Sequence, residues 1–180
     1  MRIKKGNSIG LIIDIQEKLY PHMHEPEVFL QKTKRLIEGL NILHIPIIVT
    51  EQYPKGLGAT LPEIKQITEK AVYLEKMSFS CCDDKSFANQ LRLSDKENVI
   101  IAGIESHVCV LQTVVDLTEL GYQPIVVGDC VSSRKPSDKE IALYRYIKER
   151  CIITTCESIL FELCRFAGTE EFKAISKIIK

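Results

Sequence analysis

The sequence has no excess of charge of either sign. Lysine plus arginine and aspartate plus glutamate each total 24 residues, so the formal net charge at pH 7 is zero. Proteins that bind nucleic acid or an anionic membrane surface usually carry a clear excess of positive charge. We therefore expect neither nucleic acid nor a membrane among the partners, and the lack of an acidic metal cluster further disfavours a nuclease.

Long hydrophobic runs are also missing. The first apolar run, residues 9–13, is far too short for a signal peptide or a membrane span, and it ends at the acidic Asp14. The seven cysteines include no C-x-x-C pair and their number is odd, so neither a zinc ribbon nor a disulfide framework fits. These features predict a cytoplasmic protein with reduced thiols.

Motifs for a bound dinucleotide or metal ion are missing as well. The pair Gly56-x-Gly58 has Leu61 where a dinucleotide fingerprint would need its third glycine, and no helix follows directly. The pair His22-x-His24 has no third ligand at a suitable spacing. We expect no cofactor and no metal.

What the chain does have is enough apolar sequence for one core. At 180 residues and 45% hydrophobic content it can bury one core and is short for two, so residues 1–180 should form a single domain. Apolar runs without alternation, typical of strands covered on both faces, alternate about six times with amphipathic helical stretches. This pattern predicts an α/β fold: a doubly wound, three-layer α/β/α sandwich of Rossmann type with a mainly parallel six-stranded sheet. If the strand order is the common 3-2-1-4-5-6, the order reverses between the first and fourth strands.

The stretch from Asn98 to Val110, NVIIAGIESHVCV, joins a buried strand to a helix. Residues 99–102 are continuously apolar, and from Val108 onward apolar residues recur at helical spacing. Cys109 then lies in the first helical turn, where unpaired N–H groups and the helix dipole favour thiolate over thiol. We expect a nucleophile that is the most readily alkylated thiol at mildly acid pH. The alternative is a small apolar residue packed under the helix.

Two further ionisable residues end strands of the predicted sheet. Asp14 follows the first strand and Lys76 follows the third. Open α/β sheets bind ligands at the carboxyl ends of their strands, where the strand order reverses. Asp14, Lys76 and Cys109 would therefore share one crevice. Taken singly, Asp14 could merely cap a turn and Lys76 could be solvated.

Six stretches, in order along nearly the whole chain, resemble the cysteine hydrolase branch of the isochorismatase superfamily, which includes nicotinamidases and isochorismatase domain-containing proteins. They read LIIDIQEKL, IVTEQYPKGLG, EKMSFSC, AGIESHVCV, VVGDCVSSR and TTCESILFEL. By this resemblance, the Asp-Lys-Cys triad of the family falls on Asp14, Lys76 and Cys109. The resemblance also implies a cis peptide bond between Ile104 and Glu105, which would turn a backbone N–H toward an oxyanion site shared with Cys109.

The resemblance implies a cysteine-dependent hydrolase that acts on a small amide, or a related acyl substrate, through a thioester intermediate. Asp14 would take the thiol proton, and Lys76 would hold Asp14 and Cys109 in position. Residues 51–55 lack the metal-binding Asp and His of nicotinamidases, which again predicts no metal.

The substrate side of the site is less defined. Gln52, Tyr53 and His107 are candidates to line the substrate pocket, although each could be structural. Two other functions stay open: a non-catalytic binding or regulatory protein on the same scaffold, and an isochorismatase-type ether hydrolase, which a nucleophilic Cys109 disfavours. By resemblance alone, we also expect a homo-oligomer.

Overall fold

Six parallel strands form one sheet in the computed structural model, which describes residues 2–180. The strands are β1 (Ser8–Ile13), β2 (Ile47–Gln52), β3 (Val72–Lys76), β4 (Asn98–Ile104), β5 (Gln123–Ser132) and β6 (Ile152–Thr154). They pair in the order β3-β2-β1-β4-β5-β6, which is the common order of such sheets. The order reverses between β1 and β4, so the carboxyl ends of these two strands flank the place where such sheets bind ligands.

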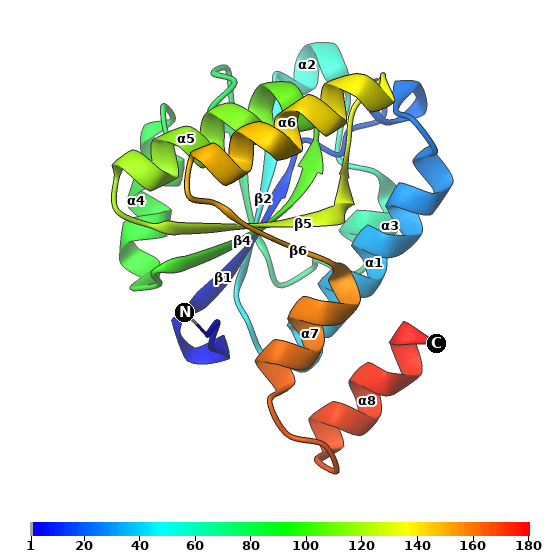
Figure 1. Ribbon diagram of the computed structural model, residues 1–180. Coiled ribbons are helices and arrows are strands. Elements are labelled where there is room, and N and C mark those ends of the chain that lie inside the picture. The colour runs from blue at the N-terminus through cyan, green and yellow to red at the C-terminus, as the bar shows by residue number, and fades with distance from the viewer. Residues whose placement is uncertain (1) are drawn as a thin grey trace.

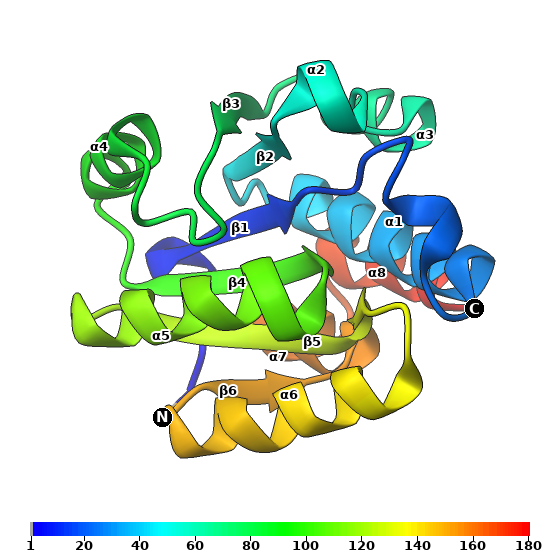
Figure 2. The same ribbon diagram turned by 90° about the horizontal axis from the view of Figure 1, so that it is seen from above.

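Helices cover both faces of the sheet (Figure 1). They are α1 (Pro26–Ile42), α2 (Pro54–Leu57), α3 (Pro62–Lys65), α4 (Lys85–Ser94), α5 (Leu111–Glu119), α6 (Pro136–Lys148), α7 (Cys156–Cys164) and α8 (Glu170–Ile179). The view from above shows α5 and α6 on one side of the strands and α1 and α8 on the other (Figure 2). The architecture is therefore the three-layer α/β/α sandwich expected from the sequence.

Two hydrophobic clusters, one on each face, hold the layers together. Strand β1 contributes to both: Leu11 packs into the cluster with α4, α5 and α6, and Ile12 packs into the cluster with α1, α7 and α8. Alternate residues of a strand point to opposite faces, so a strand covered on both sides must be apolar throughout. All six residues of β1 and all seven of β4 are buried.

Strand β5 is longer than the sequence predicts. The apolar run suggests a strand over residues 123–127 followed by a loop, but β5 continues to Ser132. Its pairing with β4 shifts after Val126 and resumes at Val131, which lies opposite Gly103. The residues between form a bulge, and a bulge breaks the apolar pattern by which a strand is recognised. Strand β6 pairs only with residues 125–127, so the end of β5 has no neighbouring strand on that side.

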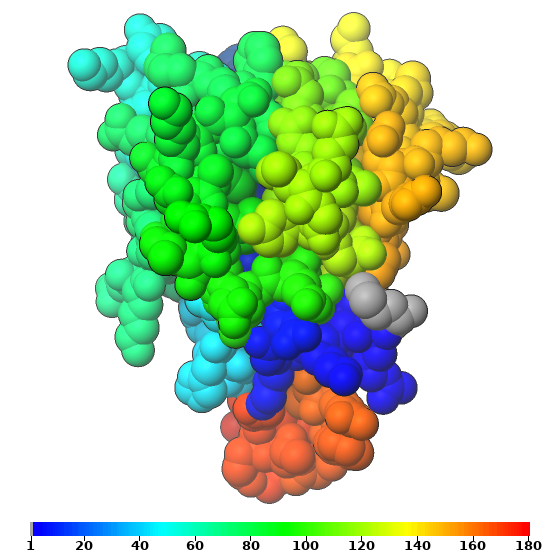
Figure 3. Space-filling model, turned by 90° about the vertical axis from the view of Figure 1, so that its left-hand side faces the viewer, coloured from blue at the N-terminus to red at the C-terminus, as the bar shows by residue number. Residues whose placement is uncertain are grey.

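The two ends of the chain lie against each other. Figure 3 shows the N-terminal segment in contact with the C-terminal helices. The backbone N–H of Ile3 donates to Glu162 Oε1 at 2.8 Å, and Lys5 Nζ lies 2.6 Å from Glu171 Oε1. Within residues 2–180, no helix is long and apolar enough to cross a membrane.

Gly103 should be one of the least replaceable residues of the sheet. Its φ is +137°, and a Cβ at this position would lie 2.2 Å from the backbone oxygen of Ile13 on β1. We expect Gly103→Ala to lower the free energy of unfolding by about 2–4 kcal/mol, because backbone on the adjacent strand cannot move aside. Urea denaturation measures this loss. Gly6→Ala is the control, since a Cβ there meets nothing within 4 Å. Equal stability of both variants would contradict the expectation.

Candidate active site

A buried ion pair joins the ends of β1 and β3. Lys76 is the last residue of β3, and its Nζ lies 2.6 Å from Oδ2 of Asp14, the residue that follows β1. The two side chains are 1% and 0% exposed. Strand β2 separates the two strands, so the lysine stem spans the distance as the sequence suggests. Asp14 has a φ of +53°, in the left-handed region that aspartate tolerates better than most residues.

Lys76 uses its ammonium group fully. Besides Asp14, Nζ donates to Gln52 Oε1 at 2.9 Å and to the backbone oxygens of Ser78 and Phe79, each at 3.1 Å. Burial on its own lowers the pKa of Lys76, but the negative charge of Asp14 opposes that effect, and the pKa lies above its ordinary value. Lys76 is therefore a permanent cation at neutral pH.

The second oxygen of Asp14 is held from the other side. Thr50 Oγ1 donates to Asp14 Oδ1 at 2.8 Å, and the thiol of Cys81 lies 3.9 Å from Thr50 Oγ1. Burial raises the pKa of Cys81 to about 12, so this thiol stays protonated. Asp14 is thus fixed by a hydroxyl and an ammonium group, and its orientation is set before any substrate binds.

Cys109 lies at the same edge of the sheet, on the turn that follows β4. The turn, Ser106–Val110, is π-helical, and α5 begins only at Leu111. Cys109 Sγ is 3.5 Å from Gln52 Oε1, the oxygen that also binds Lys76, and the residue is 7% exposed. Thr113, one helical turn later, donates to the backbone oxygen of Cys109 at 2.7 Å. Lys76 and Cys109 therefore meet at one amide oxygen, and Asp14 is joined to them through Lys76.

The expected lowering of the thiol pKa is wrong for this environment. Burial raises the pKa of Cys109 well above its ordinary value, the negative charge of Asp14 raises it further, and Lys76 only partly compensates. The sequence argument rested on the start of a helix and on a nearby lysine, but neither indicates how deeply the sulfur is buried. Cys109 is consequently a thiol at neutral pH.

The peptide bond between Ile104 and Glu105 is cis. The turn that follows it is anchored to its surroundings: Ser106 Oγ donates to the backbone oxygen of Ser132 at 2.9 Å, and the Tyr146 hydroxyl donates to that of Ser106 at 2.6 Å. Glu105 accepts from Arg134 Nε at 3.0 Å. These contacts fix the backbone of the turn that contains Cys109.

The three candidates for the substrate pocket lie in different surroundings. Gln52 has its amide occupied, since Oε1 binds Lys76 and Cys109 while Nε2 donates to the backbone oxygen of Met77 at 3.0 Å. Tyr53 is 47% exposed next to Gln52. His107 is half-buried, with Nδ1 3.0 Å from Ser133 Oγ. The geometry makes Gln52 a positioning residue and leaves Tyr53 the more open to a ligand.

Several residues of the site carry no signal that singles them out in the sequence. Thr50 ends the apolar run of β2, and its hydroxyl could be mistaken for an ordinary strand residue. Thr113 stands four residues after Cys109, the spacing at which a helical threonine bonds a backbone oxygen. The side-chain amide of Gln16 binds the backbone of Gln52: Oε1 accepts from the N–H of Gln52 at 2.7 Å, and Nε2 donates to its backbone oxygen at 2.9 Å. Within residues 2–180, no group of three or more His, Cys, Asp or Glu side chains is placed to hold a metal ion.

Comparison with known proteins identifies the family. Residues 8–158 match the model of the isochorismatase domain. The chain belongs to the isochorismatase family. Isochorismatase family protein 1B of Dictyostelium discoideum is 38% identical over 99% of this chain and 89% of its own length. Isochorismatase domain-containing protein 1 of Danio rerio is 35% identical, and this chain spans 62% of its length.

Solved structures show the same isochorismatase fold. A structure described as the MAR1 ribonuclease of Caenorhabditis elegans is 39% identical, with a TM-score of 0.94 over 99% of this chain and 92% of that one. The YcaC gene product of Escherichia coli, described as an octameric hydrolase of unknown specificity, is 22% identical with a TM-score of 0.95 over 99% and 89%. The homologues support a hydrolase.

Alkylation should report the protonated state of Cys109. Because burial and Asp14 hold its pKa above the usual range, the thiolate fraction should rise about tenfold for each pH unit from about pH 6 to about pH 9. We expect the rate of iodoacetamide labelling at Cys109, followed by mass spectrometry, to rise in step. A rate that levels off above neutral pH would show a thiolate already formed.

The buried pair should matter more for stability than an exposed pair of equal length. Lys76→Met leaves Asp14 buried without its cation, and we expect a loss of about 3–5 kcal/mol in the free energy of unfolding at neutral pH. Lys173→Met is the matched control, because Lys173 Nζ also lies 2.6 Å from its partner, Glu170, but both side chains are exposed. That loss should stay below about 1 kcal/mol. Similar losses in urea denaturation would contradict the argument.

Proposed function

We propose that the chain is a cysteine-dependent hydrolase that acts on a small amide, or a related acyl substrate, through a thioester intermediate. The observation that carries this proposal is one buried site in which Lys76 contacts both Asp14 and Gln52 Oε1, and Cys109 contacts the same oxygen of Gln52. A nucleophile, a base and a cation that fixes the base are the groups that covalent acyl transfer requires.

The first step follows from the protonation states. Cys109 rests as a thiol beside Asp14. As Sγ attacks the carbonyl carbon, its proton passes to the Asp14 carboxylate, so the negative charge moves from Asp14 to the substrate oxygen. Lys76 stays charged throughout and keeps Asp14 oriented, with Thr50 on its opposite side. The base is thus positioned before the reaction, which spares the cost of ordering it in the transition state.

The new oxyanion needs hydrogen-bond donors. In our proposal these are backbone N–H groups of the turn at Cys109, the turn that follows the cis bond between Ile104 and Glu105. In comparable enzymes, one such donor contributes about 3–4 kcal/mol to transition-state stabilisation. The contacts of Ser106 and Glu105 hold this backbone in place.

The intermediate then breaks down in two stages. Asp14 returns the proton to the leaving nitrogen, the C–N bond breaks, and an amine departs while the acyl group stays on Cys109 as a thioester. Water then attacks the thioester with Asp14 as base, which releases a carboxylic acid and restores the thiol. The sum is an amide and water converted to an acid and an amine. Tyr53 and His107 remain our candidates for contact with the substrate.

Other functions on the same scaffold predict different results. A binding or regulatory protein would retain small molecules without turnover, and an ether hydrolase would release a ketone and an alcohol rather than an acid and an amine. One relative, 39% identical, is described as a ribonuclease. An RNA substrate therefore belongs in the test, although the zero net charge does not favour binding of a polyanion.

A screen of small primary and secondary amides should find turnover that depends on the triad. We expect Cys109→Ala to lower kcat/KM more than a thousandfold, because the covalent route is lost, and Asp14→Asn to lower it by a similar order. Ammonia or amine release measures the rate. Single-stranded RNA and a vinyl ether are tested with the same variants.

The control for the screen is Cys151→Ala, which removes a buried thiol before β6, away from the triad. Its kcat/KM should equal that of the parent. Amide turnover that survives in Cys109→Ala would contradict the covalent mechanism, and triad-dependent cleavage of RNA alone would contradict the substrate class.

We also propose that the protein forms homo-oligomers. Three large apolar residues form a stripe along α6: Ile141, Tyr144 and Ile147 are 61%, 66% and 61% exposed. Apolar stripes of this kind are characteristic of protein interfaces. The octameric description belongs to the E. coli neighbour and supports the idea only through the shared fold. The cytoplasmic location inferred from the reduced thiols stays a prediction, and one relative, 34% identical, is described as a secreted effector from Phytophthora sojae.

Sedimentation velocity at micromolar concentration tests the oligomer. We expect the wild type to sediment as an oligomer and Tyr144→Glu to shift it toward the monomer, because a charge would be buried at the interface. The control is Leu93→Glu on α4, where the leucine is 74% exposed but stands outside the stripe. A monomeric wild type would refute the proposal.

A further inference from the structure

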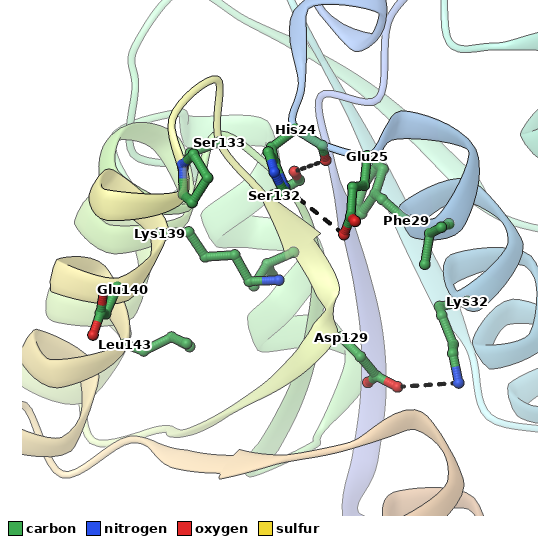
Figure 4. Close-up of a pocket in the computed structure, with 13 residues that line it drawn as sticks. His24, Glu25, Phe29, Lys32, Asp129, Ser132, Ser133, Lys139, Glu140 and Leu143 are labelled. Carbon is green, nitrogen blue, oxygen red and sulfur yellow. Dashed lines mark hydrogen bonds and ion pairs between the residues drawn. The ribbon is translucent and has the colours of Figure 1, made fainter.

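A cavity of about 370 Å³ lies beside the bulged end of β5, apart from the triad. Strand β6 pairs only with residues 125–127, so no strand covers this edge of β5 where Asp129, Val131 and Ser132 line the cavity. The start of α1 forms one wall and the first half of α6 forms the other (Figure 4). Its volume is within the range of small-molecule sites. None of Asp14, Lys76 and Cys109 lines it.

Lys139 of α6 extends its side chain into this cavity (Figure 4). Among residues 2–180, no carboxylate lies within 4.0 Å of its ammonium group and no hydrogen bond from it is formed, although the other cavity lysine, Lys32, lies 3.8 Å from Asp129. Burial lowers the pKa of Lys139, while Asp129, Cys130 and Glu25 oppose that effect from a distance. Lys139 is thus a half-buried cation that has no hydrogen-bond acceptor and no carboxylate partner among residues 2–180.

One of the acids that line the cavity, Asp129, has its own partners. Asp129 Oδ1 accepts from the backbone N–H of Cys156 at 2.8 Å, and its Oδ2 faces Lys32. Glu25 lies 3.8 Å from the ring of His24. Together with Glu140, they give the lining three acidic groups against two lysines. A ligand with two negative charges would therefore meet more repulsion than a ligand with one, whose single charge can contact Lys139.

The lining also has an apolar part, to which Val28, Phe29 and Leu143 contribute. Phe29 of α1 and Leu143 of α6 lie on opposite walls of the cavity (Figure 4). A ligand that fits should combine one anionic group with a short hydrocarbon or aromatic body. We propose that this cavity is a second binding site, for small monocarboxylates, with the carboxylate at Lys139 and the apolar body between Phe29 and Leu143.

The site would be connected to the turn that bears Cys109. Ser132 and Ser133 line the cavity, and the same two residues bind the turn: the Ser132 backbone oxygen accepts from Ser106, and Ser133 Oγ contacts His107. The proposal does not depend on the hydrolase activity, because binding at Lys139 is measured directly and the triad is not part of the cavity.

Titration of the isotope-labelled full-length chain with benzoate, followed by amide NMR shifts, tests the proposal. We expect saturable shifts at Phe29, Asp129 and Lys139 with a millimolar Kd, the affinity that a ligand of this size can reach. Benzyl alcohol, which has the same body without charge, and inorganic phosphate, which carries up to two charges, should bind at least about tenfold more weakly.

Variants of the lysine separate this site from any other. Lys139→Met should weaken benzoate binding about tenfold or more, since a charge-assisted hydrogen bond is lost, and Lys139→Arg should keep it. Lys135→Met is the control, because Lys135 is exposed just before α6 and does not line the cavity. Cys109→Ala should also keep the binding. No saturation at tens of millimolar benzoate, phosphate binding as tight as that of benzoate, or undiminished binding in Lys139→Met would each overturn the proposal.

Discussion

The contact between Lys76 and Asp14 is the interaction on which the candidate site depends. It links the ends of β1 and β3 across β2, and the ammonium group also holds Gln52 and the backbone after β3. A charge buried this deeply is tolerated only when it is paired and hydrogen-bonded. A shift of β1 against β3 would therefore separate the two charges and leave each of them buried and unpaired. This contact also holds Gln52, and through it the surroundings of Cys109, in place.

The parallel strand topology explains how residues far apart in the sequence come together in the candidate site. The reversal of strand order brings the ends of β1 and β4 side by side, so Asp14 and Cys109 become neighbours although they are far apart in sequence. Gly103 lets β4 approach β1 where a side chain would collide with backbone. Close approach and burial then act together: the same packing that assembles the residues also removes water from the sulfur.

Sequence reasoning, on the assumption of the common strand order, placed Asp14, Lys76 and Cys109 at one edge of the sheet, because the ends of parallel strands lie at the same edge. It did not recover the end of β5, since a bulge carries no periodic signal, nor the role of Gln52, which depends on one side-chain conformation. It also assigned the wrong direction to the pKa of Cys109. Proximity to charges can be inferred from strand position, but the depth of burial emerges only when the layers pack.

A buried thiol that keeps its proton has one more property. Peroxides oxidise the thiolate far faster than the thiol, and the resulting sulfinic and sulfonic acids are largely beyond repair. A cysteine with a pKa raised by burial and by Asp14 is therefore shielded from oxidative loss, and in the proposed mechanism it would become reactive only when Asp14 accepts its proton. The same environment that lowers the reactivity of the free thiol would in this way slow its irreversible oxidation.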